Sequence, residues 1–432
     1  MDSVFERRVW TLVYACLGVV EGGTAAVMVR SLFGSAAPSL VVDLVLALVS
    51  SAPAWANLVS LAYARRAQGR PKVQFLRPLL AAMAVCVGAL ALLPVGGAGL
   101  VGFLVIYCSA RLLWAGVDTV RSVIWSVNFP RHLRARVTGR ILVNGSIAIA
   151  GVGLLLGWLL EQGGPWYRAA ILAAAACGIA GSVAFKRFKV RQESRLLADE
   201  LSRVREGARF DLAGVRQLLA RDPRYRSYMM AMSTFGAGNL MVTPLMVVTL
   251  DDVLHAPEIV QVAVTAALPI VMMPIFLQPW AAFLDRHHVI VYRSVHAWIA
   301  VAGSVMLAAA VLLHTAWLVW PGALLMGISL AAGSLGWSLG HNDFAPRGEE
   351  TRYMALHVTL TGLRGLLAPT GAVLVYHALL RWLPGFETWS MLLPVAFITL
   401  GAGQFTAMRR AHLAEAGAAQ GRNPAAQPNG AE

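Results

Sequence analysis

The sequence predicts an all-α membrane protein whose twelve transmembrane helices form two pseudo-symmetric six-helix bundles. Three observations support this fold class: twelve long apolar segments, an apolar composition, and Lys and Arg residues that collect in every second gap between segments. A helix needs roughly 20 mostly apolar residues to cross the hydrocarbon core of a bilayer. Such segments lie at 9–33, 39–62, 78–96, 99–127, 138–160, 166–185, 227–250, 258–283, 290–313, 316–340, 353–378 and 388–408.

The composition excludes a soluble globular protein. Hydrophobic residues make up 58% of the 432 residues, charged residues only 13%, and the mean hydropathy is +0.64. This balance leaves too little polar surface to cover a soluble chain of that length. The four cysteines all lie inside the predicted spans and follow neither a disulfide framework nor a metal-ligand spacing.

The net charge of +14 describes topology rather than a nucleic-acid partner. If the N-terminus is cytoplasmic, 30 of the 36 Lys and Arg residues fall on the cytoplasmic side. Positive residues beside a span favour that side of the membrane. We therefore expect both termini in the cytoplasm, no nucleic-acid partner, and anionic lipid headgroups as neighbours.

The chain divides into an N-terminal bundle at 1–185, a cytoplasmic linker at 186–226, a C-terminal bundle at 227–409 and a tail at 410–432. Within the linker, the apolar residues of Leu212–Leu219 recur at helical spacing, which suits a helix lying on the inner membrane surface. A solvated connector explains the same pattern equally well. The tail lacks a core-forming pattern and is expected to be disordered.

The two halves share sparse sequence matches in the same order. Ala37-Pro38 opens the second span as Ala256-Pro257 opens the eighth, and Ser122-x-x-Trp125-Ser126 recurs as Ser334-x-x-Trp337-Ser338. Each match is weak alone, but their nearly constant displacement favours a duplicated six-helix unit. Internal repeats of this kind are typical of secondary transporters.

The six-plus-six arrangement and the loop after the second span of each half resemble the major facilitator superfamily. The family's loop reads Gly-x-x-x-Asp-Arg-x-Gly-Arg; here the C-terminal copy keeps Asp285-Arg286 and the N-terminal copy keeps Gly69-Arg70-Pro71-Lys72. Ala62 and Arg66 stand at the expected Gly and Asp of the N-terminal copy. The resemblance implies a monomeric carrier of the bacterial inner membrane, in which a charge lock at these loops depends mainly on Asp285 and Arg286.

Glu21 and Arg111 are the predicted proton-coupling residues. Each lies about 12 residues inside its span, which places the two within roughly 6 Å of one another in depth. An unpaired charge at mid-bilayer costs several kcal/mol and usually faces a partner or water. Some drug/proton antiporters of the resembling family carry an acid on helix one and an Arg on helix four. A permanent structural ion pair is the alternative role.

Arg364 is the predicted anchor for the substrate, with Thr361 and His357 one and two turns earlier on the same helical face. A guanidinium there favours a carboxylate or phosphate group. The alternative is an Arg whose head reaches the inner interface. Asn239 and Thr243, one turn apart, are candidate neutral contacts to substrate, or else ordinary hydrogen bonds between helices.

Three sets of residues are candidates for gating. Asp285 and Arg286 belong to the family loop. Asp118 and Arg121 are three residues apart near the inner end of the fourth span and can pair locally. Asp43 lies about 5 residues inside the outer edge, as an outer gate or an interfacial residue.

No phosphate-binding loop, nucleophile elbow or zinc-protease motif occurs in the chain, so we expect neither an enzyme nor a cofactor. His287-His288 and His341-Asn342-Asp343 have no complementary cluster and predict no metal site. The sequence thus predicts a secondary transporter that moves a small anionic or amphipathic solute by alternating access, coupled to protons. Uncoupled or Na⁺-linked transport, and a non-transporting scaffold on the same fold, are the alternatives.

Overall fold

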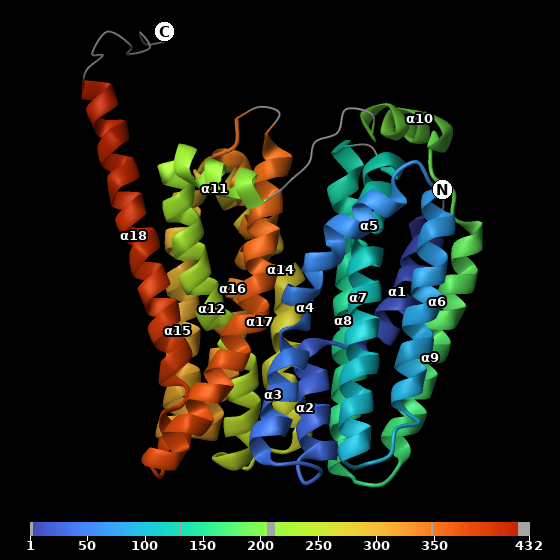
Figure 1. The fold of residues 1–432 in the computed structure, drawn as a ribbon, viewed down its shortest axis with the longest axis vertical. Helices are drawn as coiled ribbons and strands as arrows, with labels where there is room; N and C mark the ends of the chain where they lie inside the picture. The colour runs from blue at the N-terminus through green and yellow to red at the C-terminus, as the bar shows by residue number, and fades with distance from the viewer. Residues whose placement is uncertain (1–2, 130, 205–211, 347–348, 422–432) are drawn as a thin grey trace, which may run out of the picture.

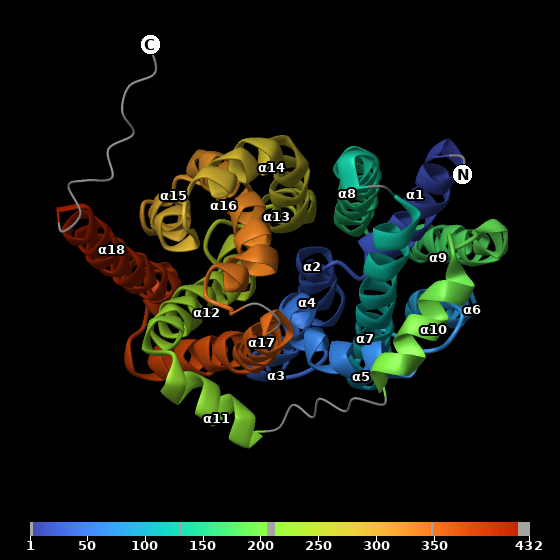
Figure 2. The same ribbon diagram turned by 90° about the horizontal axis from the view of Figure 1, so that it is seen from above.

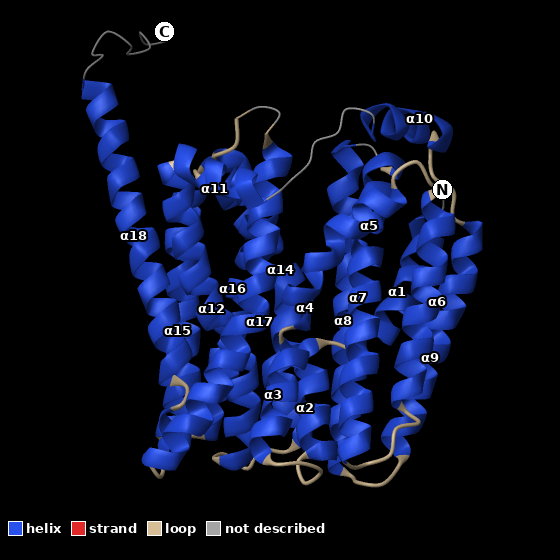
Figure 3. Ribbon diagram, in the orientation of Figure 1, coloured by secondary structure: helices blue, strands red, loops and turns tan. Residues whose placement is uncertain are grey.

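The computed structural model describes residues 3–129, 131–204, 212–346 and 349–421, and every regular element in those ranges is helical (Figure 3). The N-terminal half contains α1 (Ser3–Val19), α2 (Gly22–Phe33), α3 (Ser39–Ser50), α4 (Ala52–Trp55), η1 (Ala56–Val59), α5 (Ser60–Ala67), α6 (Lys72–Leu90), α7 (Gly97–Asn128), α8 (Arg131–Glu161), α9 (Trp166–Ala184) and η2 (Phe185–Arg187). The linker contains α10 (Glu193–Val204) and α11 (Leu212–Arg221). The C-terminal half contains α12 (Pro223–Asp252), α13 (Glu258–Val262), the π-helical turn η3 (Ala263–Ala267), α14 (Leu268–Arg286), α15 (Val289–Leu312), η4 (Ala316–Leu318), α16 (Val319–Leu339), η5 (Gly340–Asp343), α17 (Glu350–Trp382), η6 (Phe386–Trp389) and α18 (Leu392–Gly421).

The expected all-helical membrane fold is confirmed. In the described ranges, 11 helical segments are long and apolar enough to cross a membrane. The pair Ser39–Ser50 and Ala52–Ala67, bent by 50°, brings the number to 12 if it forms one span. The spans therefore follow the twelve apolar segments of the sequence.

The helices form two groups with a seam between them. In Figures 1 and 2, α1 to α9 lie on one side and α12 to α18 on the other. The linker helices, the start of α1 and the end of α18 lie at one end of the molecule, which we call the linker end (Figure 1). The end where α2 joins α3 is called the opposite end.

The second span of each half begins after a proline, as the internal repeat predicts. Pro38 precedes α3 and Pro257 precedes α13, with φ values of −53° and −55°. Proline suits this position because its fixed φ allows the helix to start and the missing N–H has no partner to lose there. The two spans share a start signal, and both depart from regular α-helix: the first bends at Ser51 and the second contains the π-helical turn η3.

The first span is broken, although the apolar segment 9–33 reads as continuous. Helix α1 ends at Val19 and α2 begins at Gly22. A Cβ on Gly22 would lie 2.5 Å from Ser50 O, and one on Gly23 would lie 2.8 Å from Thr265 O in the other half. The two glycines therefore let the break fit tightly between neighbouring backbones.

A small-residue face on α8 forms part of the seam. A Cβ on Gly157 would lie 3.0 Å from the Ile259 Cα of α13, and one on Gly153 would lie 3.3 Å from a methyl group of Val262. Small residues permit this close approach of two helices in a membrane. Gly153 and Gly157 thus join the two halves through packing.

The last helix is longer than the sequence suggested. Helix α18 runs to Gly421, so it continues past residue 409, where we placed the start of a disordered tail. Ala, Leu, Glu and Gln dominate this stretch and are strong helix formers, which explains the extension. Residues 422–432 lie outside the described part of the chain.

Candidate functional site

A cavity of about 390 Å³ lies between the two halves, near the break in the first span. Its N-terminal wall includes Glu21, Ser50 and Pro53. Its C-terminal wall includes residues from five helices, among them Asn239, Thr243, Arg293, Thr361 and Arg364. A cavity of this size accommodates a small organic molecule.

Glu21 is the N-cap residue of α2. Its Oε2 accepts hydrogen bonds from the backbone N–H groups of Gly23, at 2.8 Å, and Thr24, at 3.3 Å. The carboxylate thus satisfies N–H groups that the broken helix leaves without an intrahelical partner, and it lies at the positive end of the helix dipole. The Glu-Gly-Gly sequence was the signal for this break.

Arg111 satisfies the other side of the same break. Its Nη1 donates to the carbonyl oxygen of Val20 at 3.3 Å, and Arg111 as a whole is only 6% exposed. Arg111 is close enough to attract the Glu21 carboxylate electrostatically. Within the described residues, however, no ion pair of 4.0 Å or less joins the two side chains, and Arg111 does not line the cavity. The structure therefore shows neighbours at a helix break rather than a closed ion pair.

Arg364 and Thr361 line the cavity from α17. Arg364 Nη1 donates to Met232 O at 2.6 Å, and its Nη2 donates to Thr361 Oγ1 at 3.0 Å. Trp337 Nε1 also donates to Thr361 Oγ1, at 3.2 Å. These bonds hold the guanidinium beside the cavity, away from the membrane interface.

The other predicted contacts divide into two groups. Asn239 and Thr243 both line the cavity, and Asn239 Nδ2 donates back to Phe235 O at 3.1 Å. His357 is 1% exposed, packs against Trp337 at a ring distance of 5.7 Å and does not line the cavity. It supports the cavity wall from behind.

Arg293 and His296 also line the cavity, and the sequence alone did not single them out. Arg293 lies only a few residues inside the apolar segment 290–313, where an arginine resembles a charge that flanks a span. In the structure it is 2% exposed, inside α15. The spacing of Arg293 and His296, three residues apart at the start of an apolar helix, was the available signal.

At the opposite end, Arg30 of α2 binds carboxylates from both halves. Its Nη1 lies 2.8 Å from Asp43 Oδ1 of α3, and its Nε lies 2.8 Å from Asp251 Oδ2 of α12. Asp252 forms a third ion pair with the same guanidinium. His377 of α17 adds a fourth contact, with Nε2 2.8 Å from Asp43 Oδ2.

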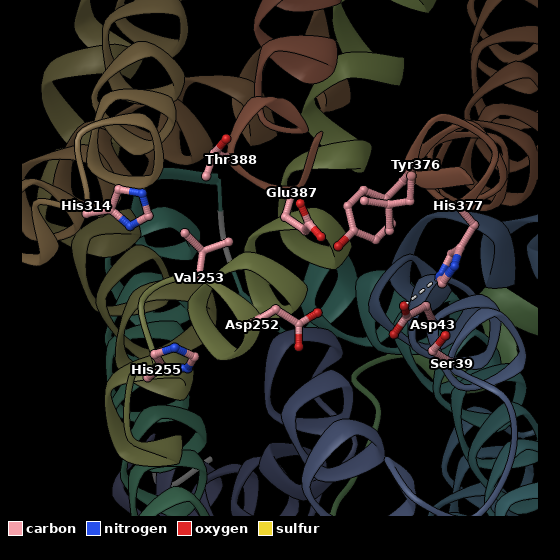
Figure 4. A pocket seen from close by; sticks show the side chains of 11 residues that line it. Ser39, Asp43, Asp252, Val253, His255, His314, Tyr376, His377, Glu387 and Thr388 are labelled. Atoms are coloured by element: carbon pink, nitrogen blue, oxygen red, sulfur yellow. Dashed lines mark hydrogen bonds and ion pairs between the residues drawn. The ribbon is translucent and has the colours of Figure 1, made fainter. Parts of the chain in front are cut away.

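Arg30 is the centre of this group of residues, which we call the Arg30 network: Arg30, Asp43, Asp251, Asp252 and His377. The side chain of Asp43 is 1% exposed, whereas Asp251 and Asp252 are 43% and 36% exposed. Figure 4 shows Asp43 and His377 facing each other at the edge of a pocket of about 420 Å³. Asp252 lines the same pocket, so the ion pairs that join the two halves lie beside it.

At the linker end the two halves face each other across a cleft of about 430 Å³. Its walls include Leu58, Leu61 and Thr119 from the N-terminal half, and Met354 and Val358 from the C-terminal half. A cleft here and ion pairs at the opposite end describe a conformation that is open toward the linker end.

Asp118 and Arg121 do pair, within one helix. Arg121 also binds the hydroxyl of Tyr14 and lies 4.5 Å from the ring centroid of Trp125. The pair therefore belongs to the N-terminal bundle. Asp285 and Arg286 are exposed, and the described residues include no ion-pair partner for either.

The family loop of the N-terminal half contacts the linker instead. Lys72 Nζ lies 2.6 Å from Glu200 Oε2 of α10, and the same oxygen accepts from Gly69 N at 2.9 Å. Glu193, also on α10, accepts from Lys72 N at 3.1 Å. These bonds attach α10 to the N-terminal half.

Comparison with known proteins identifies the architecture. The family model described as Major Facilitator Superfamily matches residues 9–369. No curated protein matches the sequence. Among solved structures, the nucleoside transporter NupG is similar at TM-score 0.70 and 11% identity, covering 94% of this chain and 99% of that one.

Two further structures are similar to a comparable degree. A D-xylose-proton symporter has TM-score 0.68 and 14% identity, covering 93% of this chain and 96% of that one. The xylose transporter XylE from E. coli, in an inward open conformation, has TM-score 0.67 and 13% identity, with coverages of 93% and 94%. At these identities the likeness concerns the fold.

Proposed function

Because this chain belongs to the major facilitator superfamily, we propose that it is a proton-coupled transporter of a small anionic or amphipathic organic solute. The family makes it a multi-pass membrane transporter and not an enzyme. The proton, the anionic class of solute and the bacterial inner membrane are our proposals. One observation supports them above the others: a carboxyl group from one half, on Glu21, and a guanidinium from the other, on Arg364, face the same cavity.

Glu21 is the proposed proton acceptor. As a carboxylate it accepts the charge-assisted hydrogen bonds of the α2 N-terminus, and protonation weakens those bonds. Proton binding and the geometry of the helix break are thereby coupled.

Helix α2 also connects Glu21 to the Arg30 network. Glu21 caps its first turn and Arg30 lies in its last turn, roughly 13 Å farther along the axis. A change at the break tilts α2 as a rigid unit and so moves the guanidinium that joins the two halves. We propose that protonation of Glu21 favours release of the Arg30 network, and with it the change from one open side to the other.

The test uses proteoliposomes with a pH-sensitive dye inside and a panel of organic anions outside. For an anion that the wild type carries, we expect accumulation driven by an imposed pH gradient. Glu21→Gln should reduce this accumulation more than tenfold while solute exchange at equal pH continues. Gln keeps an acceptor oxygen for the α2 N–H groups, so the variant removes charge and little else.

Glu161→Gln, at an exposed site at the end of α8, is the matched control and should transport like the wild type. Transport that ignores the pH gradient would favour an uncoupled carrier, and transport that follows a sodium gradient would favour Na⁺ coupling. If no anion or neutral solute moves at all, the scaffold alternative is favoured.

A further inference from the structure

We infer that the C-terminal half carries a preformed site for a dianionic phosphate or phosphonate group, formed by Arg293 and Arg364. The solute would then be a small apolar molecule that bears one such group. This inference names the substrate class of the cavity described above, so it rests on the proposed function.

Each guanidinium lies flat against a glycine. A Cβ on Gly236 of α12 would lie 2.6 Å from Arg364 Cζ, and one on Gly336 of α16 would lie 2.8 Å from Arg293 Cζ. No other residue leaves this space, since even an alanine methyl would displace the guanidinium. Both arginine heads are thus seated at defined places beside the cavity.

Within the described part of the chain, neither guanidinium has a carboxylate partner at ion-pair distance. The ion pairs found there involve other basic residues, and Arg30 alone contacts three carboxylates. Arg293 Nη2 reaches only Gly333 O, at 3.5 Å, and the buried Nε atoms of Arg293 and Arg364 have no acceptor. A buried guanidinium without a counter-ion or a full set of acceptors is costly.

The charge of the site indicates a dianion. Arg293 and Arg364 both line the C-terminal wall of the cavity and are close enough to repel each other electrostatically. A group with two negative charges neutralises both guanidiniums, whereas a single carboxylate leaves one positive charge buried. Phosphate and phosphonate also offer three oxygens, which suit two forked donors on different helices.

The remaining walls define the rest of the ligand. Phe235, Ile270, Met326 and Leu330 surround the cavity with apolar surface. Glu21 lies on the N-terminal wall, where a second anionic group would be repelled. We therefore expect the phosphate against the C-terminal half and an apolar body toward α14 and α16.

The experiment measures thermal stabilisation of the purified protein in phosphatidylcholine nanodiscs. Phenyl phosphate, benzoate and benzylamine are titrated as probes that share a ring and differ in charge. Phenyl phosphate should bind at least tenfold more tightly than benzoate, and benzylamine should not stabilise the protein. Arg293→Met and Arg364→Met should each weaken phenyl phosphate binding by tenfold or more.

Arg381→Met is the matched control, because Arg381 is an exposed residue of the same helix as Arg364, and it should bind phenyl phosphate like the wild type. If either Met variant fails to fold, Arg364→Lys keeps the charge and should show an intermediate loss. Equal binding of phenyl phosphate and benzoate, or undiminished binding by the Arg variants, would overturn the site.

A short-chain phosphatidic acid separates a soluble solute from a lipid headgroup. Tighter binding of this lipid than of phenyl phosphate would overturn the soluble-solute assignment. The measurement is independent of transport. Phosphate binding without proton-driven flux would therefore refute the coupling proposed above and leave the anion site intact. Proton-driven flux without phosphate binding would refute the anion site and leave the coupling intact.

Discussion

The two ends of the molecule use their charged residues differently. At the opposite end, Arg30 and Asp43 bind across the seam to Asp251, Asp252 and His377 of the C-terminal half. At the linker end, the ion pairs of the described residues do not cross from one bundle to the other; examples are Asp118 with Arg121, Lys72 with Glu200, and Arg221 with Glu349.

This difference indicates which contacts select the conformation. An ion pair across the seam is broken when the halves separate at that end, so it stabilises one state relative to the other. An ion pair within one half survives in both states and cancels from their difference in free energy. The Arg30 network thus favours the conformation open toward the linker end, and the residues of the family loop do not.

Removing the Arg30 guanidinium should have the largest effect on the ratio of the two conformations. Arg30→Met removes the two ion pairs that cross the seam, to Asp251 and Asp252, whose side chains are 43% and 36% exposed; such pairs contribute about 1 kcal/mol each at the upper end of the usual range. The ratio of the two conformations should then shift by more than one order of magnitude, roughly thirtyfold. A cysteine at Ser50, in the cavity, should become reactive to an impermeant maleimide added from the opposite end.

The labelling requires a background in which Cys16, Cys86, Cys108 and Cys177 are replaced by Ser. Arg168→Met is the control, because Arg168 donates to Leu93 O within the same half and should leave labelling unchanged. Unchanged labelling in Arg30→Met would show that packing, rather than the Arg30 network, closes this end.

Loss of Glu200 should have an intermediate effect, confined to the linker. Glu200→Gln removes a charge-assisted hydrogen bond to Lys72, whose side chain is 2% exposed, and such a bond contributes about 1.5–3 kcal/mol. Amide hydrogen exchange in α10 should accelerate by tenfold or more, while cavity labelling stays as in the wild type. Acceleration throughout the N-terminal half would instead mean that α10 stabilises the bundle as a whole.

Loss of Asp118 should have the smallest effect. Its carboxylate is 49% exposed and pairs within one helix, so Asp118→Asn should change the free energy of unfolding by about 0.5 kcal/mol. Neither the unfolding transition nor the Ser50 labelling should move measurably. A shift in labelling similar to that of Arg30→Met would place Asp118 in a gate and contradict the assignment of this pair to one bundle.

The sequence predicted the spans and several of the residues that line the cavity. Glu21, Arg364, Asn239, Thr243 and Thr361, each chosen as a polar residue inside an apolar segment, all line the same cavity. These residues could be identified because a polar group in hydrocarbon is costly and therefore faces a partner or a cavity. Arg293 was missed, since an Arg near the end of an apolar segment resembles an ordinary flanking charge.

The residues of the Arg30 network were mostly missed, although Asp43 was considered for an outer gate. Arg30 and Asp251 are 221 positions apart, and neither belongs to a spaced motif. Nothing in the local pattern distinguishes a charge at the end of a helix that meets water from one that meets the other half.

The sequence alone determined the helical membrane fold, the twelve apolar segments and the division into two related halves. These properties depend on local sums of hydrophobicity, length and charge, which do not require knowledge of distant contacts. The tertiary structure alone decided where the first helix breaks, which charges meet across the seam, and which arginines are buried without a counter-ion. Those features depend on the pairing of helices far apart in the chain, and the cost of a buried charge is set by the neighbours that such pairing supplies.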